Sequence, residues 1–188
     1  MEGHGEAEAV RILIDRIALA LVPTTYMKVG SPLRVPRDKL VRRPGELERY
    51  VRLAANQGGP DGRILILFDA DDDCPRSLAT NLLARATEAR SDRRIQVVIA
   101  KREYEAWFLA AAESIAASKR VEGPISRPDD PEAIRDAKGR LSAILGKPHA
   151  YQPVRDQAAL TAVFDLEEAR RYSPSFDKMC RAIGALLV

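Results

Sequence analysis

The stretch Arg63-Ile-Leu-Ile-Leu-Phe-Asp69 is apolar between its two charged ends and follows a turn at 58–62 that is rich in glycine. A second apolar run, Ile95-Gln-Val-Val-Ile-Ala100, follows further along the chain. Short continuous apolar runs are typical of strands that are buried on both faces of a parallel sheet. The segment between them, 75–90, has the pattern of a helix with proline in its first turn. This order of strand, helix and strand predicts an α/β fold with a mainly parallel sheet.

Helical patterns extend outward from this unit in both directions. Apolar residues at three- and four-residue spacing predict further helices over 6–21, 44–56 and 102–118. A mixed run at 27–35, interrupted by glycine and proline, is the weakest strand candidate. Beyond residue 120 the capping signals predict only helices, beginning at Asp130, Asp156, Asp165 and Ser173. We therefore expect an α/β core over 1–120 and a helical C-terminal extension over 121–188 that packs on it.

Composition excludes several classes of protein. The 188 residues are 46% hydrophobic and 30% charged, as in a globular protein, and no apolar run is long enough to span a membrane. Two cysteines are too few for a disulfide framework. The first residues lack the basic and apolar regions of a signal peptide, so we expect a cytoplasmic protein with no membrane partner. Aromatic residues make up only 5%, which argues against a broad surface for stacking bases.

Positive charge is concentrated between residues 28 and 52. This stretch holds eight Lys or Arg and three Asp or Glu, a local charge of +5, whereas the whole chain carries only +3. Such a stretch is either a solvated arginine-rich surface or a patch that contacts nucleic-acid phosphates. On the second interpretation the candidate phosphate ligands are Arg34, Arg37, Lys39, Arg42 and Arg43.

Acidic residues follow the first apolar strand directly, in Asp69-Ala-Asp-Asp-Asp73. Sites in open α/β sheets form at the carboxyl ends of strands. Two carboxylates about 4 Å apart repel by roughly 4 kcal/mol at an effective dielectric of 20, and a hard cation such as Mg²⁺ removes that cost. One of Asp72 and Asp73 has a simpler explanation as the cap of the helix that begins at Pro75. That explanation leaves Asp69 and Asp71 as metal-ligand candidates, with Asp73 a further one.

Three other groups of residues have less specific signals. Glu2-Gly-His-Gly-Glu6 places two acids around a glycine turn, although a frayed terminus explains it equally well. Glu103 and Glu105 follow the second strand, where they either approach a metal or merely face the positive end of a helix dipole. The nearby cations Lys101 and Arg102, and the more distant Lys138 and Lys147, are candidates for contacting phosphate or neutralising transition-state charge.

These blocks together resemble a known family. A Glu-Gly turn that opens a helix, followed later by a strand ending in Asp-x-Asp, resembles the toprim domain of topoisomerases, bacterial primases and Overcoming Lysogenization Defect nucleases. Four blocks are similar to the bacterial family called domain of unknown function 4276, whose members are toprim-like and often encoded near ATPases. These blocks are Glu2-Gly-His-Gly-Glu6, Asp69-Ala-Asp-Asp-Asp-Cys-Pro75, Arg102-Glu-Tyr-Glu-Ala-Trp-Phe108 and Ser173-Pro-Ser-Phe176.

The resemblance implies a toprim-like sheet and an assignment of roles. Glu2 would act as general acid/base or metal ligand, Asp69 and Asp71 would hold Mg²⁺ or Mn²⁺, and Glu6 would join the metal site as in the nuclease branch. Toprim proteins carry a strand directly before the Glu-Gly turn. Because Glu2 is the second residue here, we expect that strand to be absent from this chain and the sheet to have one member fewer.

The leading hypothesis is a Mg²⁺-dependent toprim-type nuclease that acts on DNA or RNA. The resemblance suggests a role in defence against phage or mobile DNA with an ATPase of the AAA or ABC type. The chain has no phosphate-binding Gly-x-x-x-x-Gly-Lys loop, so such an ATPase would be a separate protein. The alternative is a catalytically degenerate module that binds nucleic acid or protein and regulates that ATPase. A phosphatase or nucleotidyl transferase acting on a small substrate is a third, weaker possibility.

Overall fold

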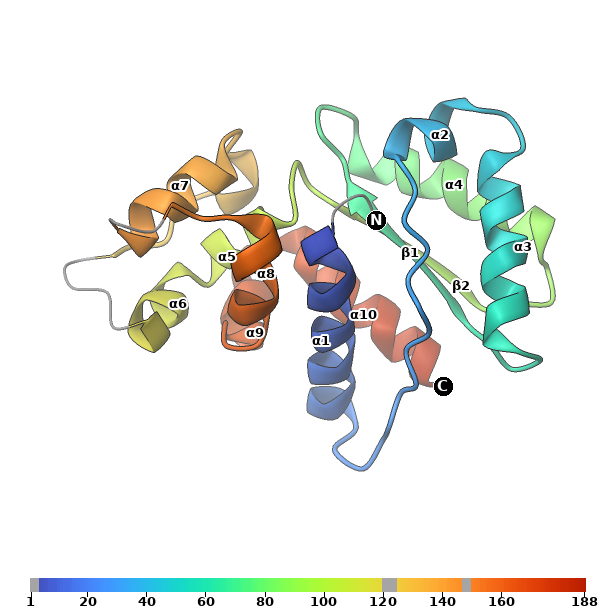
Figure 1. Cartoon of the computed structure of the whole chain (residues 1–188), viewed down its shortest axis with the longest axis horizontal. Helices are drawn as coiled ribbons and strands as arrows, with labels where there is room; N and C mark the ends of the chain where they lie inside the picture. The colour runs from blue at the N-terminus through green and yellow to red at the C-terminus, as the bar shows by residue number, and fades with distance from the viewer. Residues whose placement is uncertain (1–3, 120–124, 147–149) are drawn as a thin grey trace.

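The computed structural model describes residues 4–119, 125–146 and 150–188, and its centre is a parallel pair of strands (Figure 1). Strand β1 (Ile64–Asp69) pairs with β2 (Ile95–Ala100), in a register that runs from Ile64 opposite Ile95 to Asp69 opposite Ala100. Helix α4 (Pro75–Ala89) connects the two strands. The parallel strand–helix–strand unit expected from the two apolar runs is therefore confirmed.

Helices cover both faces of this pair, as Figure 1 shows. Side chains such as Ile66 and Phe68 pack into one apolar cluster with α4 and α3 (Glu46–Gly58). Leu67 and Val98 point to the opposite face, where α1 (His4–Leu21) and α10 (Pro174–Leu187) complete a second, larger cluster. Alternate residues of each strand therefore face different helical layers. The strands are apolar apart from Asp69 and Gln96 because both faces are buried.

The remaining elements are short helices, mostly in the C-terminal part. They are α2 (Arg37–Arg42), α5 (Glu105–Ala110), α6 (Ala112–Lys119), the 3₁₀ helix η1 (Pro131–Ala133), α7 (Ala137–Leu145), α8 (Pro153–Thr161) and α9 (Leu166–Tyr172). The C-terminal part is thus helical, as expected, and the fold is a mixed α/β arrangement. Its toprim-like assignment stays a prediction. None of the helices in the described ranges is long and apolar enough to cross a membrane.

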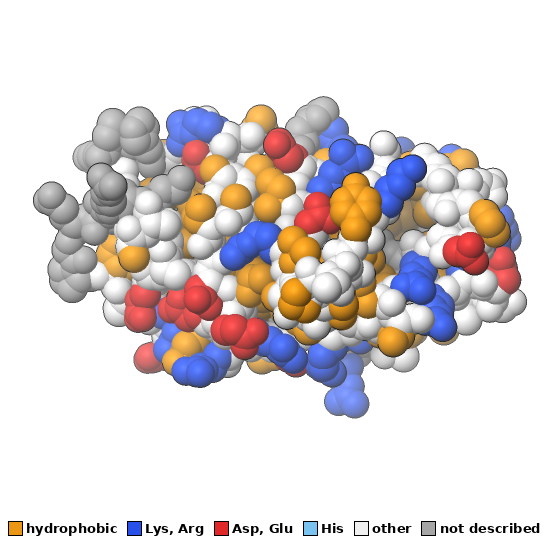
Figure 2. Space-filling model, turned by 90° about the horizontal axis from the view of Figure 1, so that it is seen from below, with side chains coloured by type: hydrophobic (Ala, Val, Ile, Leu, Met, Phe, Trp, Pro, Cys, Tyr) orange, Lys and Arg blue, Asp and Glu red, His pale blue; other side chains and the backbone are white. Residues whose placement is uncertain are grey.

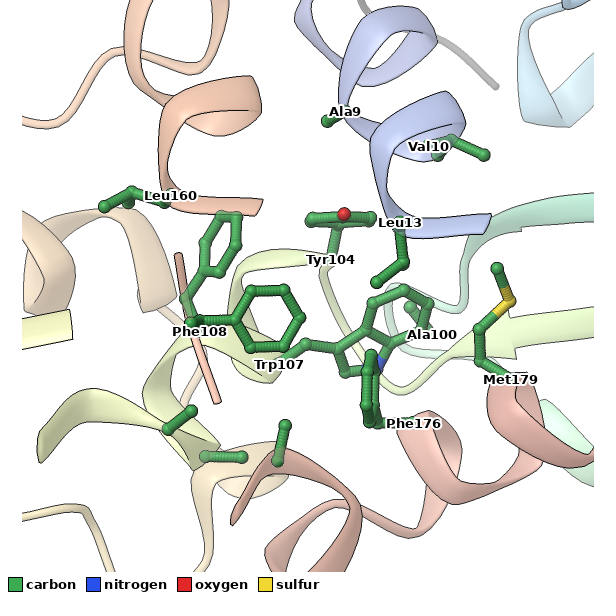
Figure 3. Close-up of a cluster of buried hydrophobic side chains, with 14 of the residues drawn as sticks. Ala9, Val10, Leu13, Ala100, Tyr104, Trp107, Phe108, Leu160, Phe176 and Met179 are labelled. Carbon is green, nitrogen blue, oxygen red and sulfur yellow. The ribbon is translucent and has the colours of Figure 1, made fainter. Parts of the chain in front are cut away.

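The larger core is centred on α5, whose side chains are all buried. Trp107 and Phe108 are fully buried. Figure 3 shows Trp107 between Leu13 of α1 and Phe176 of α10, and the Trp107 and Phe176 ring centroids are 5.3 Å apart. The same cluster contains residues from α1, α7, α8 and α10, so the helices of the two ends of the chain share one core.

Several sequence-based boundaries require correction. The run 27–35 forms no strand, because its backbone pairs with no other described strand. The helix expected over 102–118 begins at Glu105 and is interrupted at Ala111. The helix expected to begin at Asp130 divides into η1 and α7, each with its own aspartate cap.

The capping predictions have mixed outcomes. Asp130, Asp165 and Ser173 accept hydrogen bonds from backbone N–H groups of the helices they precede, as predicted. Asp156 is not a cap, because α8 begins earlier, at Pro153 after Gln152. The cap of α4 is Cys74, with no side-chain hydrogen bond, so neither Asp72 nor Asp73 caps that helix.

Candidate functional site at the carboxyl end of the sheet

Two loops that carry acidic residues leave the sheet at the same edge. We call 69–73, which includes the last residue of β1, the first loop, and 101–105, which includes the first residue of α5, the second loop. Since β1 and β2 are parallel and in register, the two loops begin side by side. Backbone hydrogen bonds then join the loops: Ala70 N–H donates to Ala100 C=O at 2.8 Å, and Asp71 N–H donates to Arg102 C=O at 3.1 Å. The acids predicted from two separate stretches of sequence are therefore brought to one place.

The two residues of this last hydrogen bond have an uncommon backbone conformation. Asp71 has φ of 52° and Arg102 has φ of 65°, and they are the two described non-glycine residues with positive φ. The left-handed region is unfavourable for residues with a Cβ, and such strain is concentrated at functional sites. Each loop turns sharply at this point, which directs the side chains of 71–73 away from the sheet.

Arg37, at the start of α2, holds the first loop from the side. Its guanidinium donates to the Ala70 carbonyl at 3.3 Å and to the Asp73 carboxylate, and its Nε lies 3.7 Å from Asp71 Oδ2. Arg37 is only 7% exposed, whereas the Asp71 and Asp73 side chains are 63% and 53% exposed. The arginine is therefore part of the protein framework, and the carboxylates it holds remain open to solvent.

Asp72 projects between two other arginines. Its Oδ1 accepts from Arg102 Nη1 at 3.0 Å and from Arg135 Nη1 at 2.9 Å. Arg102 belongs to the second loop, and Arg135 lies just before α7, so the contact joins three segments. Two guanidinium groups that converge on one oxygen form an arrangement that also suits a phosphate.

The second loop carries its carboxylates into the protein. Lys138 of α7 lies with its Nζ 3.4 Å from Glu103 Oε2 and 3.7 Å from Glu105 Oε2. Tyr151 donates its hydroxyl to Glu105 Oε1 at 3.0 Å. Glu105 is only 2% exposed, so its charge is compensated by direct partners and not by water.

Burial and neighbouring charges raise the pKa values of both Glu105 and Lys138. Burial raises the pKa of Glu105 above its ordinary value, and Lys138 opposes that rise only in part. Burial alone would lower the pKa of Lys138, but the carboxylates of Glu105 and Glu103, with a further contribution from Asp69, raise it. The ammonium group of Lys138 is therefore kept charged at the carboxyl end of the sheet.

Contacts to α10 fix the second loop and the segment before α7. Ser175 Oγ accepts from Trp107 Nε1 at 2.8 Å and from Lys101 N–H at 3.3 Å. The buried carboxylate of Glu132 accepts from Ser173 Oγ at 2.5 Å and from Ser175 N–H at 2.9 Å. The block at 173–176 that the sequence singled out thus anchors both segments that supply cations to the site.

Other residues predicted for the site lie elsewhere or outside the description. Glu2 and Lys147 lie outside the described residues, and Glu6 belongs to α1 with a side chain that is not described. Arg34, Arg42 and Arg43 are exposed, Lys39 is partly exposed, and Arg42 pairs with Asp38 at 3.3 Å. Arg37 departs from these neighbours, because it is buried against the acidic loop and does not form part of their exposed surface.

Sequence reasoning did not identify Arg135 and Tyr151 as members of this group. Arg135 reaches Asp72 across 63 residues of sequence, and Tyr151 reaches Glu105 across 46. Neither residue lies in a recognisable motif, so no local signal points to the contact. The helix α2 was also missed, because its six residues are too few for a clear apolar repeat.

The donor set has the chemistry that a hard divalent cation requires. Mg²⁺ commonly binds one or two carboxylates together with water and substrate phosphate. Asp69 and Asp71 supply carboxylates of this kind, and the buried oxygen Glu103 Oε2 is paired with Lys138 Nζ at 3.4 Å. Within the described ranges, no group of three or more His, Cys, Asp and Glu side chains is arranged to hold a metal ion alone. The described acids alone therefore do not form a protein cage for a metal ion.

Comparison with known proteins assigns the chain to a family. The model of the family described as Domain of unknown function (DUF4276) matches residues 1–184, and the chain belongs to this family. No curated protein and no solved structure matches the chain.

Proposed function

We propose that this member of the DUF4276 family is a Mg²⁺-dependent phosphodiesterase of the toprim-type nuclease class, acting on DNA or RNA in the cytoplasm. The observation that carries the proposal is the meeting of two acidic loops with a charged lysine at the carboxyl end of a parallel sheet. The resemblance of Asp69-Ala-Asp71 to the toprim Asp-x-Asp pattern supports it. Mn²⁺ would substitute for Mg²⁺ in such an oxygen-ligand site.

Asp69 and Asp71 would hold the cation, with Glu103 beside them. A bound Mg²⁺ would offset charge on the scissile phosphate and activate water. Lys138 supplies the protein's own positive charge, because its Nζ is kept protonated by Glu103 and Glu105. A lysine held in this way can stabilise the charge that develops on a phosphate in the transition state.

Arg102 and Arg135 are proposed to hold a neighbouring phosphate of the substrate. They already converge on Asp72, whose side chain is 74% exposed. An exposed ion pair of this kind is weak, so a phosphate can displace the carboxylate at low cost. The exposed Arg34, Arg42 and Arg43 and the partly exposed Lys39 would extend the contact along the nucleic-acid backbone. Lys147, which lies outside the described residues, is a further candidate.

The ion pairs of Arg37 favour a second candidate function. Arg37 occupies positions next to Asp71 and Asp73 that a cation would otherwise take. A site kept in this state would be a non-catalytic module that binds nucleic acid or protein and regulates a partner. The family resemblance suggests an AAA or ABC-type ATPase as that partner, in defence against phage or mobile DNA.

Cleavage of a mixed panel of DNA and RNA with Mg²⁺ or Mn²⁺ tests the proposal. Asp69→Asn keeps the size of the side chain and removes its charge, and we expect at least a ~100-fold loss of metal-dependent cleavage. Asp61→Asn is the matched control, because Asp61 is exposed in the turn at the other end of β1. Equal cleavage by wild type and Asp69→Asn would exclude this site. Binding without cleavage in all variants would favour the regulatory module.

A further inference from the structure

The segment between α1 and α2 presents one aromatic ring and cations to solvent. In Figure 1 residues 22–36 leave the end of α1, turn, and run back alongside the sheet to α2. Exposure alternates after the turn: Tyr26 and Lys28 are exposed, whereas Met27 and Val29 are partly buried against the larger core. Alternation of this kind is typical of extended backbone, in which successive side chains point to opposite sides. Tyr26 and Lys28 therefore lie on the outer side of the segment, away from the core.

The ring of Tyr26 is open to solvent. Tyr26 is 87% exposed, the highest value among the exposed large apolar residues of the described ranges. None of the ring pairs or cation–π contacts found in those ranges includes it. Burying an aromatic ring stabilises a protein, so a ring left in water contributes little to the stability of the fold. A ring with a free face is what the stacking of a nucleobase requires.

Cations accompany the ring, and no acid interrupts them along the segment. Lys28 and Arg34 are exposed on the segment itself. The exposed Arg11 of α1 donates from Nη2 to Gly30 C=O at 3.3 Å, so its guanidinium lies beside the segment. The sequence between residues 16 and 37 contains no Asp or Glu. Figure 2, seen from the side on which α1 ends, shows Lys and Arg side chains beside apolar ones on that face. The segment therefore combines an open ring with uncompensated positive charge.

We propose that the outer side of this segment, with Arg11 beside it, is a binding track for single-stranded nucleic acid. One base stacks on Tyr26. The neighbouring phosphates contact three cations, Arg11, Lys28 and Arg34. A single strand is required, because the faces of a base inside a duplex are already covered by its neighbours. Stacking tolerates every base, so the track recognises an unpaired strand and not a particular base sequence.

The track leads toward the acidic loops. Its segment continues directly into α2, where the Arg37 guanidinium contacts the first loop. A strand bound on the track is therefore directed to the carboxyl end of the sheet, where cleavage is proposed. In naming a single-stranded substrate for that cleavage, the inference rests on the proposed function. Binding to the track is independent of it, because stacking and phosphate contacts need neither a metal ion nor cleavage.

Binding measured in EDTA separates this inference from the proposed function. Fluorescence anisotropy gives the Kd of the full chain for labelled oligo-dT and oligo-U of about 20 nucleotides, longer than a typical single-strand site. Tyr26→Ala should raise the Kd for at least one oligomer about 10-fold, whereas Tyr26→Phe keeps the ring and should stay within about 2-fold of wild type. The oligomer with the larger loss identifies DNA or RNA as the bound strand. A change below about 2-fold for both oligomers, or no binding by wild type, would overturn the proposal whatever the cleavage assay gives.

A charge variant and a duplex complete the test. Lys28→Gln should reduce the slope of log Kd against log salt concentration by about 0.7, the value for one phosphate contact on a single strand. Arg171→Gln is the matched control, because Arg171 is exposed on α9, on the other side of α1 from the track (Figure 1). Equal slopes for the two variants would overturn the track, because only the net charge would then matter. Equal weakening of oligo-dT and of a hairpin duplex by Tyr26→Ala would overturn the assignment to a single strand.

Discussion

The two loops at the carboxyl end of the sheet have similar acidic composition but opposite environments. After β1, the side chains of Asp71, Asp72 and Asp73 are 53% to 74% exposed and pair with arginines. After β2, the side chains of Glu103 and Glu105 are 25% and 3% exposed and share Lys138. The first loop is itself a solvent-exposed turn that leads to α4, whereas the second leads directly into α5 at the centre of the larger core.

Because of this difference, the two sets of carboxylates are suited to different roles. Exposed ion pairs are weak, so replacing an arginine by another cation costs little free energy. The first loop is therefore suited to reversible ligand binding. Buried acids cannot lose a partner without leaving an uncompensated charge, so the second loop is suited to holding Lys138 in place. The predictions below test this contrast, in order of decreasing effect on stability.

Removing Lys138 should cause the largest loss. Lys138→Met leaves the buried Glu105 without its cationic partner, and we expect a loss of about 2 kcal/mol in the free energy of unfolding. Lys138→Arg is the control, because it keeps the charge near both carboxylates. Urea unfolding of the three proteins measures the effect. A loss for Lys138→Met below about 0.5 kcal/mol would mean that the buried pair behaves like a surface ion pair.

Removing the Tyr151 hydroxyl should cost somewhat less. Tyr151→Phe keeps the ring and deletes one hydrogen bond to a carboxylate, for which we expect a loss of about 1.5 kcal/mol. Tyr172→Phe is the matched control, because no hydrogen bond of the Tyr172 hydroxyl is found in the described structure and its ring contact with Arg127 is retained. Equal thermal unfolding of the two variants would contradict the role of Tyr151 in holding Glu105.

The buried loop should also give stability a characteristic pH dependence. Burial raises the pKa of Glu105 above 4.5, so the folded protein binds that proton more tightly than the unfolded chain does. Its contribution to stability is complete below the ordinary pKa and declines as the pH rises through the raised pKa, by at most about 1.4 kcal/mol per pH unit. Glu105→Gln should reduce this decline in urea unfolding between pH 4 and 8. Asp72→Asn should leave it unchanged.

The exposed first loop should contribute least to the free energy of unfolding. Asp72→Asn removes the charge that Arg102 and Arg135 share, but the side chain is 74% exposed. We expect a loss below about 0.5 kcal/mol that shrinks further as NaCl is raised, because salt screens exposed charges. A larger loss that is insensitive to salt would show that the two loops are energetically alike and would remove the contrast drawn above.

The sequence alone was sufficient to predict the parallel unit and the position of its acids. The runs at 64–69 and 95–100 are almost entirely apolar because helices cover both faces of the sheet, and this pattern is visible without a structure. The place of Asp69 follows directly, since a strand that ends in an acid presents it at the sheet edge. Capping by Asp130, Asp165 and Ser173 could also be predicted from the sequence, because an N-cap side chain bonds to the helix that directly follows it.

Only the tertiary structure decided which side chains contact the acidic loops. Arg37, Arg135, Lys138 and Tyr151 reach the acidic loops from segments that are far away in the sequence, and nothing in their own neighbourhoods indicates the partner. The same holds for the run 27–35, the weakest strand candidate, which forms no backbone hydrogen bond with β1 within the described ranges. Apolar periodicity is a local property that each segment carries in itself, whereas an ion pair or a strand pairing depends on where the rest of the chain has packed.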